Sequence, residues 1–217
     1  MIEYTLKIEL LSDMIFGSGM ATPGSVDLEV LHDSYGIPYM KGKTIKGKLR
    51  EEVRNITRWI NNGVEDAETV ARLFGCADRA DMDSLLFSNV TIDENVIKII
   101  RKEVKSKESS INSDDILLAF TGVRSHTSID YETGKARKGS LRRLQTINKG
   151  IIFYCTISSR KELSAKDEAL LCAATAGLRH LGVNETRGKG LVRCSLIKNG
   201  EDITSVGVNA LLGKEES

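Results

Sequence analysis

The sequence predicts a single α+β domain whose elements follow the order β-α-β-β-α-β. Three observations support this prediction. Apolar residues alternate in Ile2–Leu10, as in a half-buried strand, and Ile151–Ile157 is a second apolar segment of strand length. Apolar residues at helical spacing follow each of these strands. The 217 residues are 41% hydrophobic, enough for one sizeable core and unlike a disordered chain. We therefore expect one domain over residues 1–217.

The first half of the chain supplies a strand, a helix and a second strand. Ile2–Leu10 alternates, so its even-numbered side chains share one face. A glycine-rich loop, a short extended piece at Leu28–His32 and a turn at Asp33–Gly36 follow it. Helical spacing then begins at Thr44, a candidate N-cap, and runs through Ile45, Leu49, Val53 and Ile56. A short helix is expected at Asp66–Phe74 and a buried strand at Leu85–Ile92.

The second half repeats this order after an insertion. Lys98–Ser113 is polar and charged, which predicts a mobile insertion at about residues 98–115. Ile151–Ile157 is the clearest strand. Ser164 begins a helix that is expected to run to about Leu181, before Gly182, and Leu191–Leu196 forms the last strand. This is the order of a ferredoxin-like fold, which is also the RRM-like scaffold for single-stranded RNA.

Several classes of site and location are disfavoured. The four cysteines are scattered without a CxxC pair, so we expect reduced, buried thiols and no zinc site. No apolar stretch approaches the roughly 20 residues of a membrane span, and no signal peptide is evident. We therefore expect a cytoplasmic protein with no membrane partner and no organic cofactor.

The net charge of +1 conceals three basic runs. Lys41–Arg54, Lys135–Lys149 and Arg179–Arg193 carry net charges of +4, +6 and +3. Together they carry +13 and the rest of the chain −12. Any one run can be a solvated face, but three runs beside glycines favour a surface for a polyanion. Because aromatic residues make up only 5%, phosphate capture is expected to dominate over base stacking.

Two of the runs contain glycine-rich motifs. Gly42-Lys43-Thr44 looks like the end of a P-loop, but the required earlier glycine is replaced by Ile37. In Gly36–Arg50, glycines at a helix N-terminus would let backbone amides approach phosphate while lysines supply charge. Gly177–Val192 places a basic glycine loop between the last helix and the last strand. An ordinary lysine-rich helix and a generic glycine turn remain the alternatives.

A third basic segment, Thr127–Ile147, contains the turn Asp130–Gly134 followed by basic residues without acidic ones. Together with Leu73-Phe74-Gly75 before Leu85–Phe87, these ordered segments cover about two thirds of the chain. They resemble the RAMP superfamily, and in particular the backbone subunits of type III CRISPR effector complexes of the Csm and Cmr kind. The chain departs from the family pattern at Met40-Lys41, where the family usually has Ile-Pro, and at Lys43-Thr44, where it has Ser-Ser.

This resemblance implies a RAMP core with an inserted thumb hairpin at about residues 121–149 and lid-like insertions. It implies guide CRISPR RNA and target RNA as ligands, with copies of the chain in a helical stack and other type III effector subunits as protein partners. A thumb in this family presses between guide and target nucleotides. The candidate RNA-binding residues are Lys41, Lys43, Lys46, Gly47, Lys48, Arg50, Arg124, Arg137, Lys138, Arg142, Arg143, Arg187 and Lys189.

The resemblance also suggests one catalytic candidate. In this family, backbone subunits that cleave RNA carry an aspartate shortly before a Gly-x-Pro-Tyr segment. The matching residue here is Asp27, before Gly36–Tyr39. A carboxylate can assist attack by a 2′-OH on the adjacent phosphate, as a base or by holding Mg²⁺ or another divalent ion. Two hypotheses therefore stand: an endoribonuclease that cleaves target RNA, and a non-catalytic guide-RNA scaffold. A more remote one is a precursor-RNA processing endonuclease, which generally relies on a histidine and lacks a thumb-like insertion such as Lys135–Lys149. His32 could act as a second acid or base, although a histidine in a turn is more often incidental, and His126 and His180 show no partner in the sequence.

Overall fold

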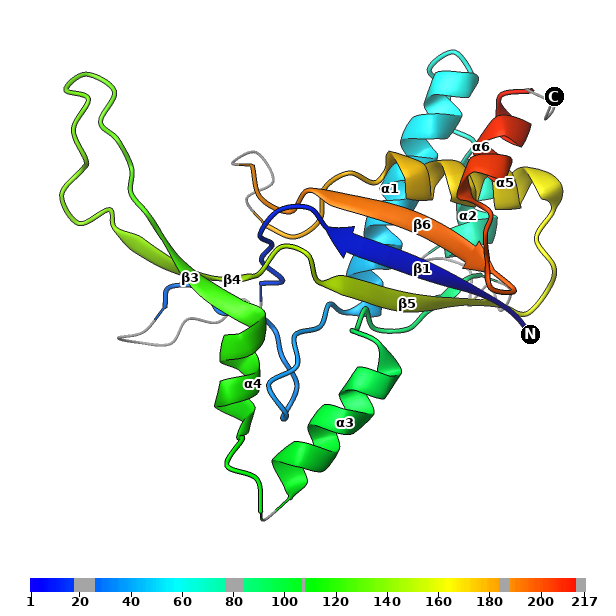
Figure 1. Cartoon of the computed structure of the whole chain (residues 1–217). Helices are drawn as coiled ribbons and strands as arrows, with labels where there is room; N and C mark the ends of the chain where they lie inside the picture. Colours follow the sequence, from blue (N-terminus) through cyan, green and yellow to red (C-terminus); the bar gives the residue numbers. More distant parts are fainter. Residues whose placement is uncertain (18–25, 77–83, 107, 184–187, 214–217) are drawn as a thin grey trace.

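The computed structural model describes residues 1–17, 26–76, 84–106, 108–183 and 188–213. Its centre is an antiparallel sheet in the order β2-β5-β1-β6-β7 (Figure 1). The strands of this sheet are β1 (Ile2–Leu10), β2 (Leu86–Phe87), β5 (Ile152–Ser159), β6 (Val192–Lys198) and β7 (Glu201–Asp202). β1 lies between β5 and β6, so the first strand of the chain is central in the sheet.

The alternation predicted for β1 sets the face of the sheet that becomes the core. Tyr4, Leu6 and Ile8 are completely buried on the side covered by helices, whereas Thr5 and Lys7 lie on the other, more open face. In register, Leu6 pairs with a residue of β5 and a residue of β6, so the same alternation continues across three strands. The strand predictions for Ile2–Leu10 and Ile151–Ile157 are confirmed, with shifts of one or two residues.

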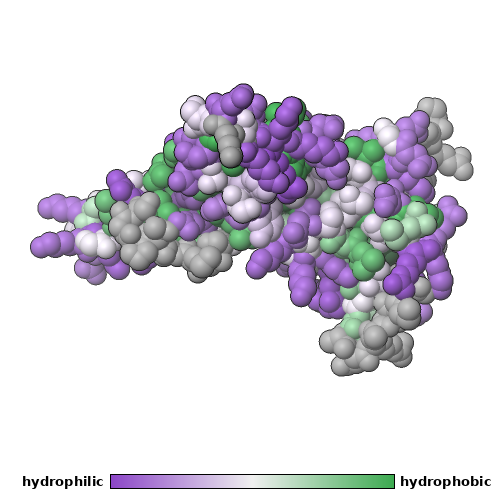
Figure 2. All heavy atoms as spheres, turned by 90° about the horizontal axis from the view of Figure 1, so that it is seen from below, coloured by the Kyte–Doolittle hydropathy of each residue, from purple (hydrophilic) through white to green (hydrophobic). Residues whose placement is uncertain are grey.

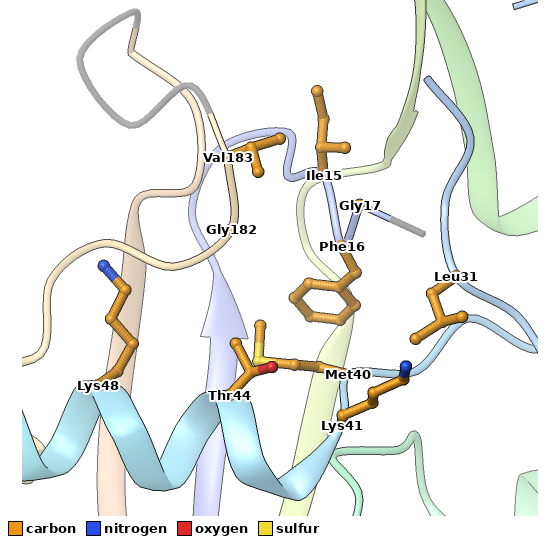
Figure 3. Close-up of a pocket in the computed structure, with 10 residues that line it drawn as sticks. All are labelled: Ile15, Phe16, Gly17, Leu31, Met40, Lys41, Thr44, Lys48, Gly182 and Val183. Atoms are coloured by element: carbon orange, nitrogen blue, oxygen red, sulfur yellow. The ribbon is translucent and has the colours of Figure 1, made fainter. Parts of the chain in front are cut away.

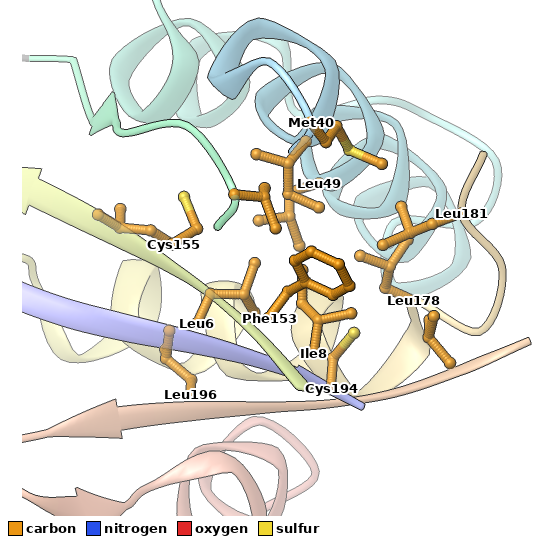
Figure 4. Packing of buried hydrophobic residues seen from close by; sticks show 14 of the residues in the cluster. Leu6, Ile8, Met40, Leu49, Phe153, Cys155, Leu178, Leu181, Cys194 and Leu196 are labelled. Atoms are coloured by element: carbon orange, nitrogen blue, oxygen red, sulfur yellow. The ribbon is translucent and has the colours of Figure 1, made fainter. Parts of the chain in front are cut away.

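Helices α1 (Gly42–Ile60) and α5 (Ala165–Gly177) lie across one face of the sheet (Figure 1). α1 turns Ile45, Leu49 and Val53 towards the strands at the predicted spacing, and Figure 4 shows Leu49 above the side chains of β1 and β5. α2 (Ala67–Phe74) follows α1 and is capped by Asp66, whose side chain accepts from the Thr69 amide. These contacts close one hydrophobic core above the sheet.

Two predicted helix ends are wrong. α1 begins at Gly42 rather than after Thr44, because Asn89 Oδ1 accepts from the Gly42 amide at 3.0 Å and replaces a local cap. α5 starts as predicted, with Ser164 Oγ accepting from the Asp167 amide at 3.1 Å. It ends at Gly177 rather than near Leu181, because the Leu181 amide donates to the Gly190 carbonyl across the following loop.

The expectation of a mobile insertion at about 98–115 is also wrong for most of that segment. It forms α3 (Glu94–Lys105) and α4 (Ser113–Phe120), which project from the core in Figure 1. Asp93 caps α3, and Asn112 and Asp115 form a capping box on α4. Ile97 and Ile100 pack against the core, so a polar composition concealed an amphipathic helix.

The extended segments are shorter than the alternation suggested. Within the predicted strand Leu85–Ile92, only β2 joins the sheet as a regular strand, and Leu86 is half exposed. The piece at Leu28–His32 makes isolated bridges instead of a strand. Two elements were not foreseen: β7, and a C-terminal helix α6 (Thr204–Leu211) that packs on α5 so closely that a Cβ at Gly207 would lie 2.5 Å from Cys172 Sγ.

A separate two-stranded sheet forms from β3 (Thr121–His126) and β4 (Arg142–Ile147). This hairpin reaches well beyond the core in Figure 1, and most of its residues between the two strands are exposed. The four cysteines are free thiols, and burial raises the pKa of Cys155 and Cys172 to about 11 and that of Cys194 to about 12. In the described part of the chain, no helix has the length and apolar character needed to cross a membrane.

Candidate nucleic-acid interface

The N-terminal half of α1 borders a hollow of about 310 Å³ beside the core. Lys41, Thr44 and Lys48 line it from the helix, and they stand on one side because their spacing is helical. Figure 3 shows Lys48 reaching towards Gly182 and Val183, with the Phe16 ring and Met40 forming an apolar floor. The hollow therefore joins the lysine-rich helix start to the second glycine-rich motif, which lies about 140 residues later.

The basic residues of α1 do not all face this hollow. Lys46 Nζ donates to the Leu85 carbonyl at 2.9 Å and lies 6.0 Å from the centre of the Phe87 ring. Burial, and secondarily the charge of Arg50, lower the pKa of Lys46. Lys46 and Arg50 lie together near β2, whereas Lys43 is exposed. Of the α1 residues predicted to bind RNA, the structure brings Lys41 and Lys48 to the hollow and places Lys46 and Arg50 elsewhere.

The two glycines of the helix start have different roles. A Cβ at Gly42 would lie 2.5 Å from the Ser88 carbonyl oxygen, so this glycine is needed for packing within the chain. A Cβ at Gly47 would meet nothing within 4 Å, and the residue is exposed in the second turn of the helix. Gly47 is therefore the glycine that leaves the helix surface open to a ligand.

The loop between α5 and β6 closes the other side of the hollow. The Val183 amide donates to the Ile15 carbonyl at 3.2 Å, and a Cβ at Gly182 would lie 2.6 Å from the same oxygen. Gly190 has φ +74°, and its Cβ would lie 2.0 Å from the Leu181 carbonyl oxygen. Lys189 between these contacts is only 9% exposed, and burial lowers its pKa. Arg187 lies outside the described residues.

Asp13 connects this loop to the base of the β3–β4 hairpin. Its backbone carbonyl accepts from the Gly190 amide at 2.9 Å. Its side chain accepts from Arg124 Nε at 2.9 Å and from the Lys149 amide at 3.2 Å. The charges of Asp13 and Arg124 both act on Lys189, so the glycine-rich loop, Arg124 of β3 and the end of the Lys135–Lys149 run meet at one carboxylate. The loop that follows Asp13 continues through Ile15 and Phe16 into the hollow.

The remaining basic candidates lie along the hairpin. Arg142 and Arg143 are exposed in β4, and Lys138 is exposed between the strands. Arg137 Nε lies 3.5 Å from Asp130 Oδ2, so its charge is partly offset by the neighbouring turn. Hydrogen bonds from the Thr133 amide and hydroxyl hold the pKa of Asp130 below its usual value. The hairpin thus carries cations along an exposed arm whose base adjoins the glycine-rich loop.

Comparison with known proteins gives this geometry its context. The sequence model of the RAMP superfamily matches residues 7–193. The chain belongs to the RAMP superfamily. A search of curated proteins gave no match.

The RAMP fold is also found in solved structures. A chain in a cryo-EM structure of the type III-B Cmr-beta complex in its apo state has a TM-score of 0.64 and 12% identity, over 92% of this chain and 99% of that one. A chain in the Cmr-beta structure bound to cognate target RNA has a TM-score of 0.60 and 11% identity, over 96% and 99%. At these identities, the likeness concerns the fold alone.

Asp27 of this RAMP chain lies beside β4 at the base of the hairpin. Its Oδ2 accepts from the Arg143 amide at 2.6 Å, and its own amide donates to the Arg143 carbonyl at 2.8 Å. The residue is exposed. Asp27 is thus an accessible carboxylate, as a catalytic group must be, but one of its oxygens also fastens β4.

Among the described residues, no three His, Cys, Asp or Glu side chains are grouped to hold a metal ion. Mg²⁺ is usually bound through one or two carboxylates together with phosphates and water. An ion at Asp27 would therefore need RNA and water for most of its ligands.

Sequence reasoning did not identify Asp13, Thr44 or Phe16 as parts of this RAMP surface. Asp13 had a usable signal, because a charged residue directly after an apolar strand and before a glycine-rich loop lies at the sheet edge. Thr44 was interpreted as a cap, a role that Asn89 fills instead. Phe16 had no signal, since its place in the hollow depends on contacts between loops.

Proposed function

We propose that the chain is an RNA-binding backbone subunit of a type III CRISPR effector complex, with guide CRISPR RNA at the α1 hollow. The observation that carries the proposal is that, on a RAMP fold, the α5–β6 loop meets the lysines of α1 at the hollow and meets Arg124 and the hairpin base at Asp13. Lys41 and Lys48 offer charge at a helix N-terminus that has no acidic residue in its first turn. This arrangement suits a phosphate backbone and requires no base-specific contact.

The fold similarity supports the assignment. The structures that resemble this chain are Cmr-beta chains, one of them from a complex bound to cognate target RNA. In this proposal the core is a ferredoxin-like RAMP domain, and the β3–β4 hairpin is the thumb that meets the guide and its target. Other type III effector subunits complete the complex.

Binding to RNA tests the proposal directly. We expect a Lys41→Gln, Lys43→Gln, Lys48→Gln variant to weaken binding to unrelated RNAs about equally, and to lower the slope of log affinity against log salt by about 2, at about 0.7 per lost contact. The matched control removes three exposed charges elsewhere, at Arg160, Lys161 and Lys166. Filter binding at several salt concentrations measures both quantities. Salt-independent binding, or equal losses in both triple variants, contradicts the proposal.

The subunit is proposed to stack along the guide with copies of itself. The hairpin extends beyond the core, and Tyr131 at its turn is 98% exposed, as expected for an arm whose contacts lie outside its own chain. Repeated head-to-tail contacts produce open helical assemblies. Light scattering with a long guide RNA is expected to show several copies per RNA. One copy per RNA at excess protein argues against a backbone subunit.

Cleavage of target RNA is proposed to depend on Asp27. An exposed carboxylate can accept the proton of an attacking 2′-OH, and the product then carries a 2′,3′-cyclic phosphate. We expect Asp27→Asn to lower the rate about 10²-fold while its amide oxygen still accepts from the Arg143 amide. The assay uses a reconstituted complex and end-labelled target, with and without EDTA, because a divalent ion is part of the proposal.

The scaffold hypothesis is supported by a specific observation. The 2.6 Å hydrogen bond from the Arg143 amide gives Asp27 a structural task at the hairpin base that needs no catalysis. The two hypotheses separate in the same assay with Asp27→Ala. Equal cleavage by wild type and both variants removes Asp27 from catalysis. A loss in Asp27→Ala that Asp27→Asn restores assigns it to the scaffold role.

A further inference from the structure

Helix α3 carries a second group of cations that none of the basic motifs includes. Lys98, Arg101, Lys102 and Lys105 are all exposed. Their spacing is i, i+3, i+4 and i+7, which places them in one stripe along the helix, about 10 Å long. We call these four residues the α3 stripe.

The α3 stripe is held in a fixed orientation. Ile97 and Ile100 pack against the core on the adjoining side of the helix, so the stripe cannot rotate inwards. The Asp93 side chain caps the helix by accepting from the amides of Asn95 and Val96. Seen from below, the part of the surface where α3 and α4 project is mostly hydrophilic (Figure 2).

The ring of Tyr35 contacts two cations of the stripe. The Tyr35 ring centre lies 5.4 Å from Arg101 Cζ and 5.5 Å from Lys105 Nζ, within cation–π range. Tyr35 is itself fixed in a turn, because Asp33 Oδ1 accepts from the amides of Tyr35 and Ile37. Figure 1 shows this turn between α3 and α4, and Gly36 has no room for a Cβ beside the Ser113 carbonyl.

The acidic residues near the stripe leave it basic. Arg101 Nη2 lies 3.5 Å from Asp33 Oδ2 in a partly exposed pair, and Lys98 Nζ lies 3.9 Å from Glu94 Oε2 in an exposed pair. Ion pairs that solvent reaches contribute little attraction. Lys102 and Lys105 have no ion pair among the residues that the structure describes. Two acidic groups therefore face four cations, and the remaining charge suits a polyanion.

The turn that carries Tyr35 also connects the α3 stripe to the α1 hollow. The Asp33 amide donates to the Ile37 carbonyl, and the Tyr39 amide donates to the Leu31 carbonyl, so residues 31–39 form a narrow ladder. Its tip carries Tyr35, and its open end leads into Leu31, Met40 and Lys41, which line the hollow. One continuous piece of backbone thus spans the proposed guide site and the stripe.

We propose that the α3 stripe and Tyr35 form a second contact for the phosphate backbone of single-stranded RNA, beyond the α1 hollow. The inference rests on the proposed function, since it extends the RNA path from that site. Arg101 and Lys105, held against the ring, lose little side-chain freedom on binding a phosphate. The contact does not depend on base identity.

The test compares two lengths of RNA, about 5 and about 20 nucleotides. An Arg101→Gln, Lys102→Gln, Lys105→Gln variant is expected to bind the short RNA like wild type and the long RNA about tenfold more weakly, with a salt slope lower by about 2. The control is the Arg160, Lys161, Lys166 triple variant. Circular dichroism and thermal unfolding of both variants check that α3 remains folded.

Tyr35 provides an independent readout that changes no charge. Tyr35→Phe keeps the ring and is expected to bind long RNA like wild type, whereas Tyr35→Leu releases both cations and is expected to lose two- to threefold, on the order of a cation–π contact at an exposed site. Full affinity for long RNA in the α3 triple variant overturns the inference while leaving the α1 site intact. The inference is also overturned if the α3 triple variant loses affinity only for poly-glutamate, used as a polyanion without phosphates, and not for long RNA. Failure of wild type to bind either RNA refutes the proposed function itself.

Discussion

The central sheet and the β3–β4 hairpin are held by different forces. In the sheet, β1 is paired on both sides and its inner residues are completely buried against α1 and α5. The hairpin is paired to itself, and its distal part is exposed. At its base, polar contacts from Asp13 and Asp27 and the buried side chains of Leu144 and Ile147 fix it to the rest of the chain.

This contrast indicates different roles for the core and the hairpin. Apolar burial gives the core one stable arrangement, because every inner position loses contacts if it moves. A hairpin that is anchored only at its base, with its distal part exposed, can keep its fold while the direction of that distal part adjusts to a ligand. The cations of the proposed RNA surface lie at the boundary between these two regions.

The largest difference between the regions is expected for apolar truncation. Leu6→Ala removes a completely buried side chain from the central strand and should lower the free energy of unfolding by about 2–5 kcal/mol. Ile129→Ala in the hairpin removes a side chain that is 66% exposed and should change it by less than about 0.5 kcal/mol. Urea unfolding measures both. Similar losses in the two variants would mean that the hairpin contributes to the core.

A smaller effect is expected from the partly buried polar network at the edge of the core. Tyr4 Oη donates to Glu168 Oε2 at 2.6 Å, and Lys198 Nζ donates to the same oxygen at 2.5 Å. Burial acts to raise the pKa of Glu168, but the hydrogen bonds from Lys198 and Tyr4 outweigh it, and its pKa is lowered. Burial and the bond to Glu168 raise the pKa of Tyr4, which stays a neutral donor.

Glu168→Gln should therefore lower the free energy of unfolding by about 1–3 kcal/mol at pH 7. Because the folded pKa of Glu168 is below its unfolded value of about 4.3, the stabilisation is present above that pH and is lost as pH falls through the folded pKa. The difference in free energy of unfolding between wild type and Glu168→Gln should decrease below about pH 4. Glu103→Gln, on an exposed helix position, is the control. If this difference stays constant down to pH 2, the charge of the Glu168 carboxylate is not responsible for the stabilisation.

The core was largely predictable from sequence, because burial follows periodicity. Positions 2 to 10 alternate and α1 repeats at helical spacing, and both patterns appear in the structure as predicted. The errors occur where tertiary contacts override local signals. Asn89 caps α1 from 47 positions away, and the Leu181–Gly190 contact shortens α5.

The candidate site was predictable as a set of segments but not as a surface. Glycine and lysine patterns located the helix start and the loop before β6. They could not show that Lys46 points to the Leu85 carbonyl while Lys48 points to the hollow. Which side of α1 each lysine occupies depends on how the helix is rotated against the sheet, and the local pattern does not give this rotation. The α3 stripe was missed because a polar composition was interpreted as lack of structure, although its charges also follow the helical repeat.

Only a small effect on global stability is expected from the polar contacts of Asp13, but its local effect tests how the hairpin is attached. Asp13→Ala removes the acceptor of Arg124 and of the Lys149 amide, and the partly exposed ion pair should change the free energy of unfolding by no more than about 1 kcal/mol. Since these contacts fasten the hairpin base, hydrogen exchange of the β3–β4 amides should nevertheless accelerate, with β1 and β5 unchanged. Asp130→Ala, at the distal turn, should leave exchange at the base as in wild type. If Asp13→Ala instead accelerates exchange in β1 as much as in β3, the hairpin and the sheet unfold as one unit, and the division between a rigid core and an adjustable arm is wrong.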